Sequence, residues 1–466
     1  MRGSGETIER SSGLSRRELM GIATAAAAFK FVPKRVLGGT GQDSANNKLN
    51  IAGIGVGGQG GGNMNALSSE NIVALCDVDE KRAAGTFNKF PDARKYKDFR
   101  QMLDKEHKNI DAVMIATPDH CHAPAAIMAM RMGKHVYCEK PMAHTIYEAR
   151  RMTEVAKEMK VVTQMGQGGH AGEGLRLTYE FIHDGAIGAV REVHVWSDRP
   201  GTPERPWWPQ GIERPTEVVP VPDGLDWDLW LGPARWRPYA KFSNGRGGEA
   251  TYCPFNWRGW WDFGCGAMGD MAVHNADPAF FCLDLDAPTA VEAETSGSND
   301  ETLPKWSIIT YEFPAKGNRP AVKMVWYDGA KMPPRPPELE EGRKLEDNGI
   351  LFVGDKGKMV CGGWSGPPRL IPESRMKDYK KPEKTLPRSP GHHKEWIDAC
   401  KAGKPEMAMA GFWYSGPFTE SLLVGNLAVR LGRRVEWDSK AMRSPNCPEA
   451  DNYVTKFYRA GWNLVS

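Results

Sequence analysis

Residues 49–60 read LNIAGIGVGGQG, a mostly apolar hexad that runs directly into a glycine-rich turn. The hexad is typical of a buried parallel strand. The turn matches G-x-G-x-x-G at Gly55, Gly57 and Gly60, where the glycines permit a tight turn, a close approach of backbone to a pyrophosphate, and tight packing of the next helix. The N-terminus of that helix offers free N–H groups to phosphates. The stretch therefore predicts the first unit of a dinucleotide-binding Rossmann domain.

An acidic side chain favours one nucleotide over another. A second apolar strand, predicted at residues 72–75, leads to Asp77, twenty-two residues after Gly55. In dinucleotide-binding folds a carboxylate at this place accepts hydrogen bonds from the adenosine ribose. Because it would repel a 2′-phosphate, Asp77 favours NAD over NADP.

The alternation of strands and helices continues through residue 165. Apolar strands are predicted at residues 110–116, 135–138 and 160–165, and the pair Thr145 and Glu148 predicts a capping box for the helix between the last two. Loops at the carboxyl ends of parallel strands line the ligand crevice of such a sheet. Three residues of the first such loop are cofactor candidates, Thr117, Pro118 and His122; His122 is equally well explained as a helix-start histidine bonded to backbone.

Glu139-Lys140-Pro141 directly after the strand at residues 135–138, with Thr117-Pro118 before that strand, resembles the glucose–fructose oxidoreductase/inositol dehydrogenase (Gfo/Idh/MocA) family. The resemblance covers about residues 48–195. It implies an α/β protein with a second, α+β domain whose open, mostly antiparallel sheet is often used to form homo-oligomers. It also implies that Glu139 and Lys140 lie beside the nicotinamide and the reacting hydroxyl. The alternative for Lys140 is a surface lysine at a strand end.

The family's second marker is D-x-x-x-H on a C-terminal helix, and this chain has Asp270 and His274, followed by Asp277. Positions i, i+4 and i+7 would place the three on one helical face. The alternative is a capping aspartate and a satisfied core histidine. On the functional interpretation His274 takes the hydroxyl proton, Asp270 orients the His274 imidazole or bonds the neighbouring hydroxyl, and Lys140 stabilises the developing alkoxide.

Nine of the sixteen tryptophans fall between Trp196 and Trp261, inside a segment rich in Pro and Gly. The segment, residues 196–268, is interpreted as an insertion relative to simpler family members. Tryptophan faces suit sugar rings, and nearby polar groups would address hydroxyls, although any single Trp is better explained as anchoring a loop. The substrate-binding candidates are His170, Asn256, Trp257, Arg258 and Asp277, with Trp207, Trp208, Trp260 and Trp261 as further stacking surfaces.

The N-terminal residues resemble an export signal. Arg16-Arg17 precedes an alanine-rich apolar run at residues 19–29, too short to span a bilayer, and this pattern predicts a twin-arginine export signal and a periplasmic location. A basic helical arm on a neighbouring subunit is the alternative. We expect residues 1–47 to be signal and linker, residues 48–168 the NAD-binding domain, and residues 169–466 the C-terminal domain.

Composition excludes several classes of protein. A net charge of +3, without a basic block, argues against nucleic acid as a partner. The nine scattered cysteines form no C-x-x-C pair, which argues against a zinc site, and no metal is expected. No stable membrane span is predicted. Alternating strands at residues 290–295, 307–313 and 321–327 predict the antiparallel sheet, and the aromatic tail after Cys447 is expected to dock.

Three functions remain open on the sequence. The first is net oxidation of a secondary hydroxyl of a sugar, glycoside or cyclitol by NAD. The second is glycoside cleavage with a tightly bound, recycled NAD, which would suit an exported protein. The third is a non-catalytic NAD- or sugar-binding protein, against which the set Lys140, Asp270 and His274 counts.

Overall fold

The computed structural model describes residues 47–464. The predicted export signal and nearly all of the predicted linker lie outside these residues. No helix within residues 47–464 is long and apolar enough to cross a membrane. Nor does this part of the chain bring three or more His, Cys, Asp or Glu side chains together as a metal site.

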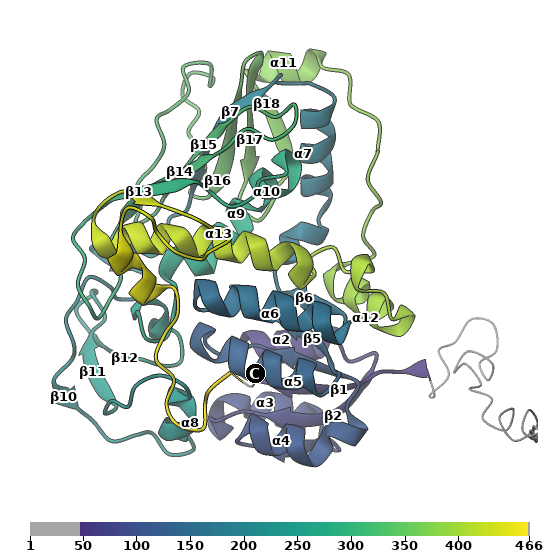
Figure 1. Ribbon diagram of the computed structural model, residues 1–466, viewed down its shortest axis with the longest axis vertical. Helices are drawn as coiled ribbons and strands as arrows, with labels where there is room; N and C mark the ends of the chain where they lie inside the picture. Colours follow the sequence, from purple (N-terminus) through teal and green to yellow (C-terminus); the bar gives the residue numbers. More distant parts are fainter. Residues whose placement is uncertain (1–46, 465–466) are drawn as a thin grey trace, which may run out of the picture. The chain divides into compact units, whose positions relative to one another are not determined.

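The N-terminal half is a six-stranded parallel sheet in the order β3-β2-β1-β4-β5-β6, with helices against it (Figure 1). This is the doubly wound order of dinucleotide-binding domains. Its strands are β1 (Asn50–Ile54), β2 (Asn71–Cys76), β3 (Arg94–Tyr96), β4 (Ala112–Ile115), β5 (His135–Cys138) and β6 (Thr163–Met165). Its helices are α2 (Gln59–Ala66), α3 (Glu80–Lys89), α4 (Phe99–Glu106), η3 (His107–Asn109), η4 (Asp119–Cys121), α5 (His122–Arg131) and α6 (Ile146–Met159).

The apolar runs became the buried strands. Every residue of β4 and β6 is buried, as is the hexad of β1 from Ile51 onward. Thr145 caps α6 and Glu148 returns the bond to the cap backbone, so the predicted capping box is confirmed. The sequence analysis did not predict β3, whose residues Arg94 and Lys95 are polar and exposed because this strand forms the edge of the sheet.

The C-terminal half is built on an eight-stranded sheet in the order β18-β17-β16-β7-β15-β14-β13-β19. All neighbours are antiparallel except β7 and β15, which confirms the expected mostly antiparallel sheet. Its strands are β7 (Val190–Trp196), β13 (Ala290–Thr295), β14 (Ser307–Phe313), β15 (Val322–Tyr327), β16 (Gly349–Gly354), β17 (Gly357–Gly362), β18 (Pro368–Ile371) and β19 (Val435–Glu436).

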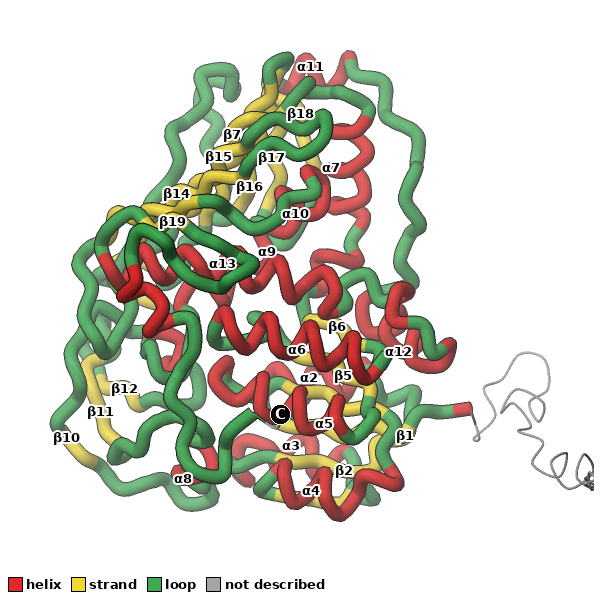
Figure 2. The backbone as a smooth tube through the Cα atoms, viewed as in Figure 1, coloured by secondary structure: helices red, strands yellow, loops and turns green. Residues whose placement is uncertain are grey.

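Helices join this sheet to the parallel one. The long α13 (Phe412–Leu431) packs on α6 from one side and on β13 from the other (Figures 1 and 2). The remaining helical elements are η5 (Gly168–Ala171), α7 (Glu173–His183), η7 (Met268–Ala272), α9 (Val273–Asn275), α10 (Asp277–Leu283), α11 (Glu373–Asp378), α12 (His392–Ala402), η8 (Pro405–Met407) and η9 (Pro448–Tyr453).

The Trp-rich segment forms an ordered subdomain of its own. It contains β8 (Gly201–Thr202), β9 (Arg205–Pro206), β10 (Glu217–Val218), α8 (Trp227–Leu231), β11 (Ala240–Ser243), β12 (Glu249–Thr251) and η6 (Asn256–Gly259). Strands β10, β11 and β12 pair as a small antiparallel sheet. Its core is aromatic, and Trp227 stacks on Trp230 at 4.8 Å between ring centroids.

The chain end straps the subdomain to the parallel-sheet half. Trp462 is 6% exposed and packs on Phe99 of α4, while the Arg100 guanidinium lies 3.9 Å from the Trp462 ring centroid. Three residues earlier, Arg459 pairs with Asp228 of α8 at 2.6 Å. The aromatic tail therefore docks, as expected from its composition.

We predict that Trp462→Ala destabilises the protein strongly. Truncating a buried Trp removes its packing and leaves a cavity, which costs about 3–5 kcal/mol of unfolding free energy. Trp236→Ala is the matched control, because Trp236 is 66% exposed and surface substitutions change stability by about 0.5 kcal/mol or less. Denaturant unfolding of both variants measures the difference, and equal midpoints would contradict the docking of the tail.

Candidate active site

One cleft gathers most of the residues selected from the sequence. It has a volume of about 620 Å³ and runs from the glycine turn after β1, across the carboxyl ends of the parallel strands, to the helices of the C-terminal half. We call it the cofactor cleft. The predicted site residues that line it are Gly55, Gly57, Asp77, Thr117, Pro118, Glu139, Lys140, Trp257, Arg258 and His274.

The glycine turn can be made only by glycines. Gly55 has φ +74°, and a Cβ on it would lie 2.7 Å from the carbonyl oxygen of Ala116. A Cβ on Gly60, which sits behind the cleft wall, would lie 1.8 Å from the carbonyl oxygen of Gly55. The turn is therefore compressed against the strand, and α2 begins directly after it. This is the cradle that a dinucleotide pyrophosphate requires.

Asp77 stands at the end of β2, beside the glycine turn. Its Oδ2 accepts a hydrogen bond from the Gly57 N–H at 2.9 Å, and its Oδ1 accepts one from the Asp79 N–H at 2.9 Å. Burial raises the pKa of Asp77, while these two N–H groups act in the opposite direction. Each carboxylate oxygen keeps lone pairs for further donors, so the group can still accept hydrogen bonds from a ribose.

Of the cofactor candidates Glu139 and His122, only Glu139 is part of the cleft wall. Glu139 lines the cleft and accepts a hydrogen bond from the Asn63 amide of α2 at 2.8 Å. His122 does not line it: both of its ring nitrogens lie 2.8 Å from backbone carbonyl oxygens, those of Pro141 and Thr117. Burial lowers the pKa of His122 to about 4. His122 thus braces the two loops on which Thr117 and Lys140 stand, in line with the alternative considered for it.

Lys140, Asp270 and Arg258 meet at one carboxylate oxygen. The Lys140 ammonium donates to Asp270 Oδ1 at 2.9 Å and to the Asp270 carbonyl at 2.8 Å, and Arg258 Nε donates to the same Oδ1 at 2.9 Å. Burial acts to raise the pKa of Asp270, but the two cations outweigh it and hold that pKa below its ordinary value. Two cations around one anion leave this group of three side chains with a net positive charge, which suits a developing alkoxide.

His274 lines the same cleft from α9 and is 7% exposed. Burial first, and the Lys140 charge second, lower the pKa of His274 to about 3. The imidazole is therefore neutral at physiological pH, and the same burial and Lys140 charge also weaken it as a base. The structure thus brings Lys140, from the parallel-sheet half, to one cleft with His274, from the C-terminal half.

The expected single helix through these residues is interrupted. Residues 268–272 form the π-helical turn η7, α9 ends at Asn275, and α10 begins anew at Asp277 with Pro278 behind it. Proline has no N–H and crowds the preceding turn, so the helix breaks and Asp277 leaves the face that carries Asp270 and His274.

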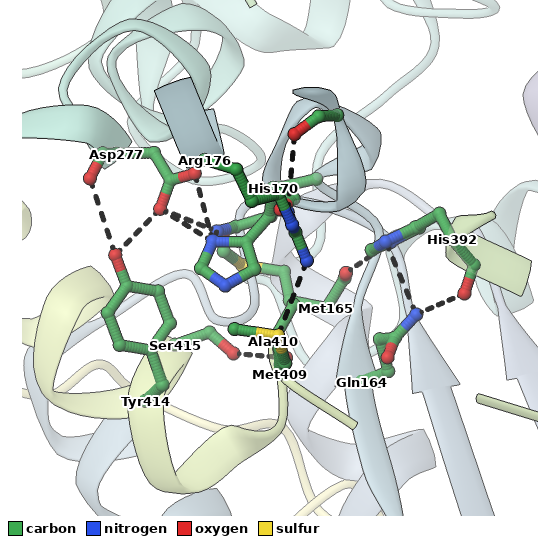
Figure 3. Close-up of polar contacts among 12 residues, drawn as sticks. Gln164, Met165, His170, Arg176, Asp277, His392, Met409, Ala410, Tyr414 and Ser415 are labelled. Atoms are coloured by element: carbon green, nitrogen blue, oxygen red, sulfur yellow. Dashed lines mark hydrogen bonds and ion pairs between the residues drawn. The ribbon is translucent and has the colours of Figure 1, made fainter. Parts of the chain in front are cut away.

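Asp277 and His170 belong to a separate buried network (Figure 3). His170 Nδ1 lies 3.0 Å from both carboxylate oxygens of Asp277, and the Tyr414 hydroxyl donates to Oδ1 at 2.6 Å. Both His170 and Asp277 are 1% exposed. This corrects the expectation that they bind substrate: they join η5, α10 and α13 in the core.

The remaining substrate candidates divide in a similar way. Trp257 and Arg258 line the cleft, with the Arg258 guanidinium 4.4 Å from the Trp257 ring centroid. The Asn256 amide instead donates to the carbonyl of Thr251 at 2.8 Å and holds the η6 loop. Trp208 and Trp260 are fully buried, so the anchoring alternative describes them better.

Sequence reasoning missed a cover over the far end of the cleft. Leu225, Leu229 and Trp230 of the Trp-rich subdomain line it together with Asp77. The Asp226 N–H donates to the carbonyl of Val78 at 2.8 Å, and Asp79 forms a β-bridge with Leu225. Nothing local in the sequence pairs residues this far apart.

Trp364 was missed as well. It lines the cleft on the side of His274, with 6.1 Å between the two ring centroids. The signal available in the sequence was a lone tryptophan inside Gly362-Gly363-Trp364-Ser365-Gly366, a turn too rich in glycine for a simple core position.

Comparisons with known proteins agree with this geometry. Two models of the Gfo/Idh/MocA family together match more than half of the chain: "Oxidoreductase family, NAD-binding Rossmann fold" over residues 48–167 and "Oxidoreductase family, C-terminal alpha/beta domain" over residues 181–325. The chain is 31% identical over 143 residues to levoglucosan dehydrogenase of Pseudarthrobacter phenanthrenivorans, covering 30% of this chain and 36% of that protein. It is 30% identical over 132 residues to inositol 2-dehydrogenase of Salmonella typhimurium, covering 28% and 39%.

The chain thus spans little more than a third of the length of these curated relatives. Among solved structures, the WlbA dehydrogenase of Bordetella pertussis in complex with NADH and UDP-GlcNAcA superposes with a TM-score of 0.56 at 18% identity, over 84% of this chain and 99% of that one. At this identity the likeness concerns the fold.

We predict that Asp77→Ala lowers affinity for NAD by about tenfold or more, since a hydrogen bond to a charged group contributes about 1.5–3 kcal/mol. Affinity for NADP should stay level or rise, because the repulsion of a 2′-phosphate is removed. Calorimetric titration with both nucleotides measures this, with the exposed Asp92→Ala as control. An unchanged preference for NAD would show that Asp77 does not discriminate between them.

Proposed function

Because the chain belongs to the Gfo/Idh/MocA oxidoreductase family, we propose that it is an NAD-dependent oxidoreductase acting on a secondary hydroxyl of a sugar, glycoside or cyclitol. The observation that carries the proposal is the shared cleft, in which Lys140 and His274 stand beside the glycine turn and Asp77. The relatives named levoglucosan and inositol 2-dehydrogenase support this class of substrate.

The residues divide the work. Gly55, Gly57 and Asp77 would hold the nucleotide, and NAD, when bound, takes up a hydride from the carbon of a secondary alcohol. Neutral His274 receives the hydroxyl proton that is left behind. Lys140, held by Asp270, keeps a positive charge directed at the oxygen while negative charge develops there.

Arg258 adds to this charge from the subdomain side. Its guanidinium bonds Asp270 through Nε and packs on Trp257 and Phe255. Since Trp257 and Arg258 both line the cleft, they would form the wall that a substrate ring meets. The Trp-rich subdomain therefore forms one wall of the site, so that residues outside the two main sheets would contribute to substrate specificity.

We predict that His274→Ala lowers turnover by about 10²–10⁴-fold and leaves affinity for NAD within about twofold. Loss of a positioned base slows proton transfer without touching the nucleotide cradle. The assay is NADH absorbance with a panel of sugars, glycosides and cyclitols, and His107→Ala, at an exposed position, is the control. Normal turnover in His274→Ala would remove this residue from the chemistry.

A second candidate function is glycoside cleavage by a protein that keeps its NAD bound and returns the hydride at the end of each turnover. The cover formed by Leu225, Leu229 and Trp230 favours it, because it lies over the end of the cleft at Asp77, where adenosine would bind. Arg459 and Trp462 in turn strap this cover down.

If the cover retains the nucleotide, the purified protein should carry nearly one NAD(H) per chain, and Trp230→Ala should release it about tenfold faster or more. Nucleotide is measured after denaturation and after timed dilution. Net oxidation would accumulate NADH, whereas cleavage would release sugar without it. A wild-type protein that is purified free of nucleotide and exchanges NAD freely would argue against cleavage with a retained cofactor.

We further propose export by the twin-arginine route, on the strength of Arg16-Arg17 and the apolar run that follows. We also propose association of copies through the eight-stranded sheet, where Ile308, Val353 and Val360 remain only half-buried on its outer face. Cell fractionation and analytical ultracentrifugation test the two statements, and a cytoplasmic protein or a monomer would refute them in turn.

A further inference from the structure

Trp364 stands where two hollows meet. One is the cofactor cleft, and the other is a hollow of about 850 Å³ on the eight-stranded sheet, which we call the side hollow. Trp364 lines both. The side hollow falls in the range of about 300–1,000 Å³ that small-molecule sites occupy, and the proposed function does not use it.

The backbone at Trp364 is strained. Both Trp364 and Ser365 have φ +56°, in the left-handed region, which is unfavourable for a residue with a side chain. Two such residues in succession persist only where the surroundings hold them, and such strain gathers at ligand sites.

Three neighbours hold this turn in place. The Trp364 N–H donates to Asn275 Oδ1 at 3.1 Å, and Asn275 follows His274 in the chain. A Cβ on Gly169 would lie 2.4 Å from the Trp364 carbonyl oxygen, and one on Gly174 would lie 2.1 Å from that of Ser365. The turn is thereby fixed to the segment that carries His274.

The side chain held in this way is not buried. Trp364 is 47% exposed, and its ring lies beside that of His274. A large aromatic surface kept open to solvent by a strained backbone serves recognition better than stability. Its flat apolar face matches the C–H face of a pyranose.

The side hollow is polar and carries charges of both signs. Lys344 and Asp347 line it, and their side chains make no hydrogen bond or ion pair to any residue of the described range 47–464. Arg369, also in its wall, is paired with Glu340 and Glu373. Unpaired donors and acceptors beside balanced charges suit a neutral polyhydroxy compound better than an anion.

We propose that Trp364 is a stacking platform between two sugar subsites, and that the substrate is a disaccharide or other glycoside of two ring units. One ring lies in the cofactor cleft beside His274, and the second unit extends past Trp364 into the side hollow toward Lys344 and Asp347. The inference rests on the proposed function and narrows its substrate class.

Binding tests this directly on the full chain loaded with NAD. The probes are matched pairs of a monosaccharide and its disaccharides: glucose with cellobiose, maltose and trehalose, galactose with lactose and melibiose, and xylose with xylobiose. Affinities are measured by saturation-transfer NMR. We expect at least one disaccharide to bind about tenfold tighter or more than its monosaccharide, and Trp364→Ala to remove that advantage.

Four variants separate stacking from folding. Trp364→Phe should retain most of the affinity, and the double variant Lys344→Ala/Asp347→Ala should weaken the disaccharide alone. Trp413→Ala, which removes another exposed tryptophan, should change nothing. Affinity for NAD should be unaltered in Lys344→Ala/Asp347→Ala, because both residues line the side hollow and not the cofactor cleft.

The outcomes distinguish this inference from the function beneath it. Equal binding of every monosaccharide and its disaccharides, or an unchanged affinity in Trp364→Ala, would overturn the two-subsite arrangement even if sugars are oxidised. Conversely, a disaccharide bound through Trp364 with neither NADH formed nor glycoside cleaved would uphold the subsites and refute the proposed function.

Discussion

The site depends on one partly buried carboxylate shared by two cations. Asp270 Oδ1 accepts hydrogen bonds from Lys140, at the end of β5, and from Arg258, in the Trp-rich subdomain. Three parts of the chain therefore meet at one atom. Such a contact is demanding, since charges withdrawn from water are stable only while they remain paired and hydrogen-bonded. Under the proposed function, the same contact would hold the Lys140 ammonium near the oxygen of the reacting hydroxyl.

The second organising feature is the path that the chain takes around the cleft. The Trp-rich subdomain has an aromatic core of its own and pairs through its backbone with the turn after Asp77. The tail then runs back across it, with Arg459 on Asp228 and Trp462 against Phe99. The subdomain covers the cleft near Asp77, and the C-terminal tail in turn packs on the subdomain. Four of the clustered tryptophans build the aromatic core of this cover, Trp227, Trp230, Trp257 and Trp260. Within residues 47–464, the tryptophans that line the cleft are Trp230, Trp257 and Trp364.

The local patterns predicted most of the fold and the nucleotide half of the site. Period-2 and continuous apolar runs located the strands, because burial on one or two faces leaves that record in the sequence. Prediction failed where a contact joins distant residues. His170 and Asp277 were assigned to substrate, but Pro278 interrupts the helix and their carboxylate–imidazole pair lies in the core with Tyr414. Residue type and spacing alone cannot distinguish a substrate-binding pair from a pair buried in the core.

By itself the sequence determined the glycine turn and Asp77, since each depends on residue type at a fixed local spacing, whereas Lys140, Asp270 and His274 were selected through the resemblance to the Gfo/Idh/MocA family. Only the tertiary structure decided which side chains share the cleft. Leu225 covers it through a bridge to Asp79, and Trp364 reaches it because Gly169 and Gly174 let a left-handed turn approach. These are packing events between segments far apart in the chain, and no local pattern encodes them because their energy resides in surfaces that exist only after folding.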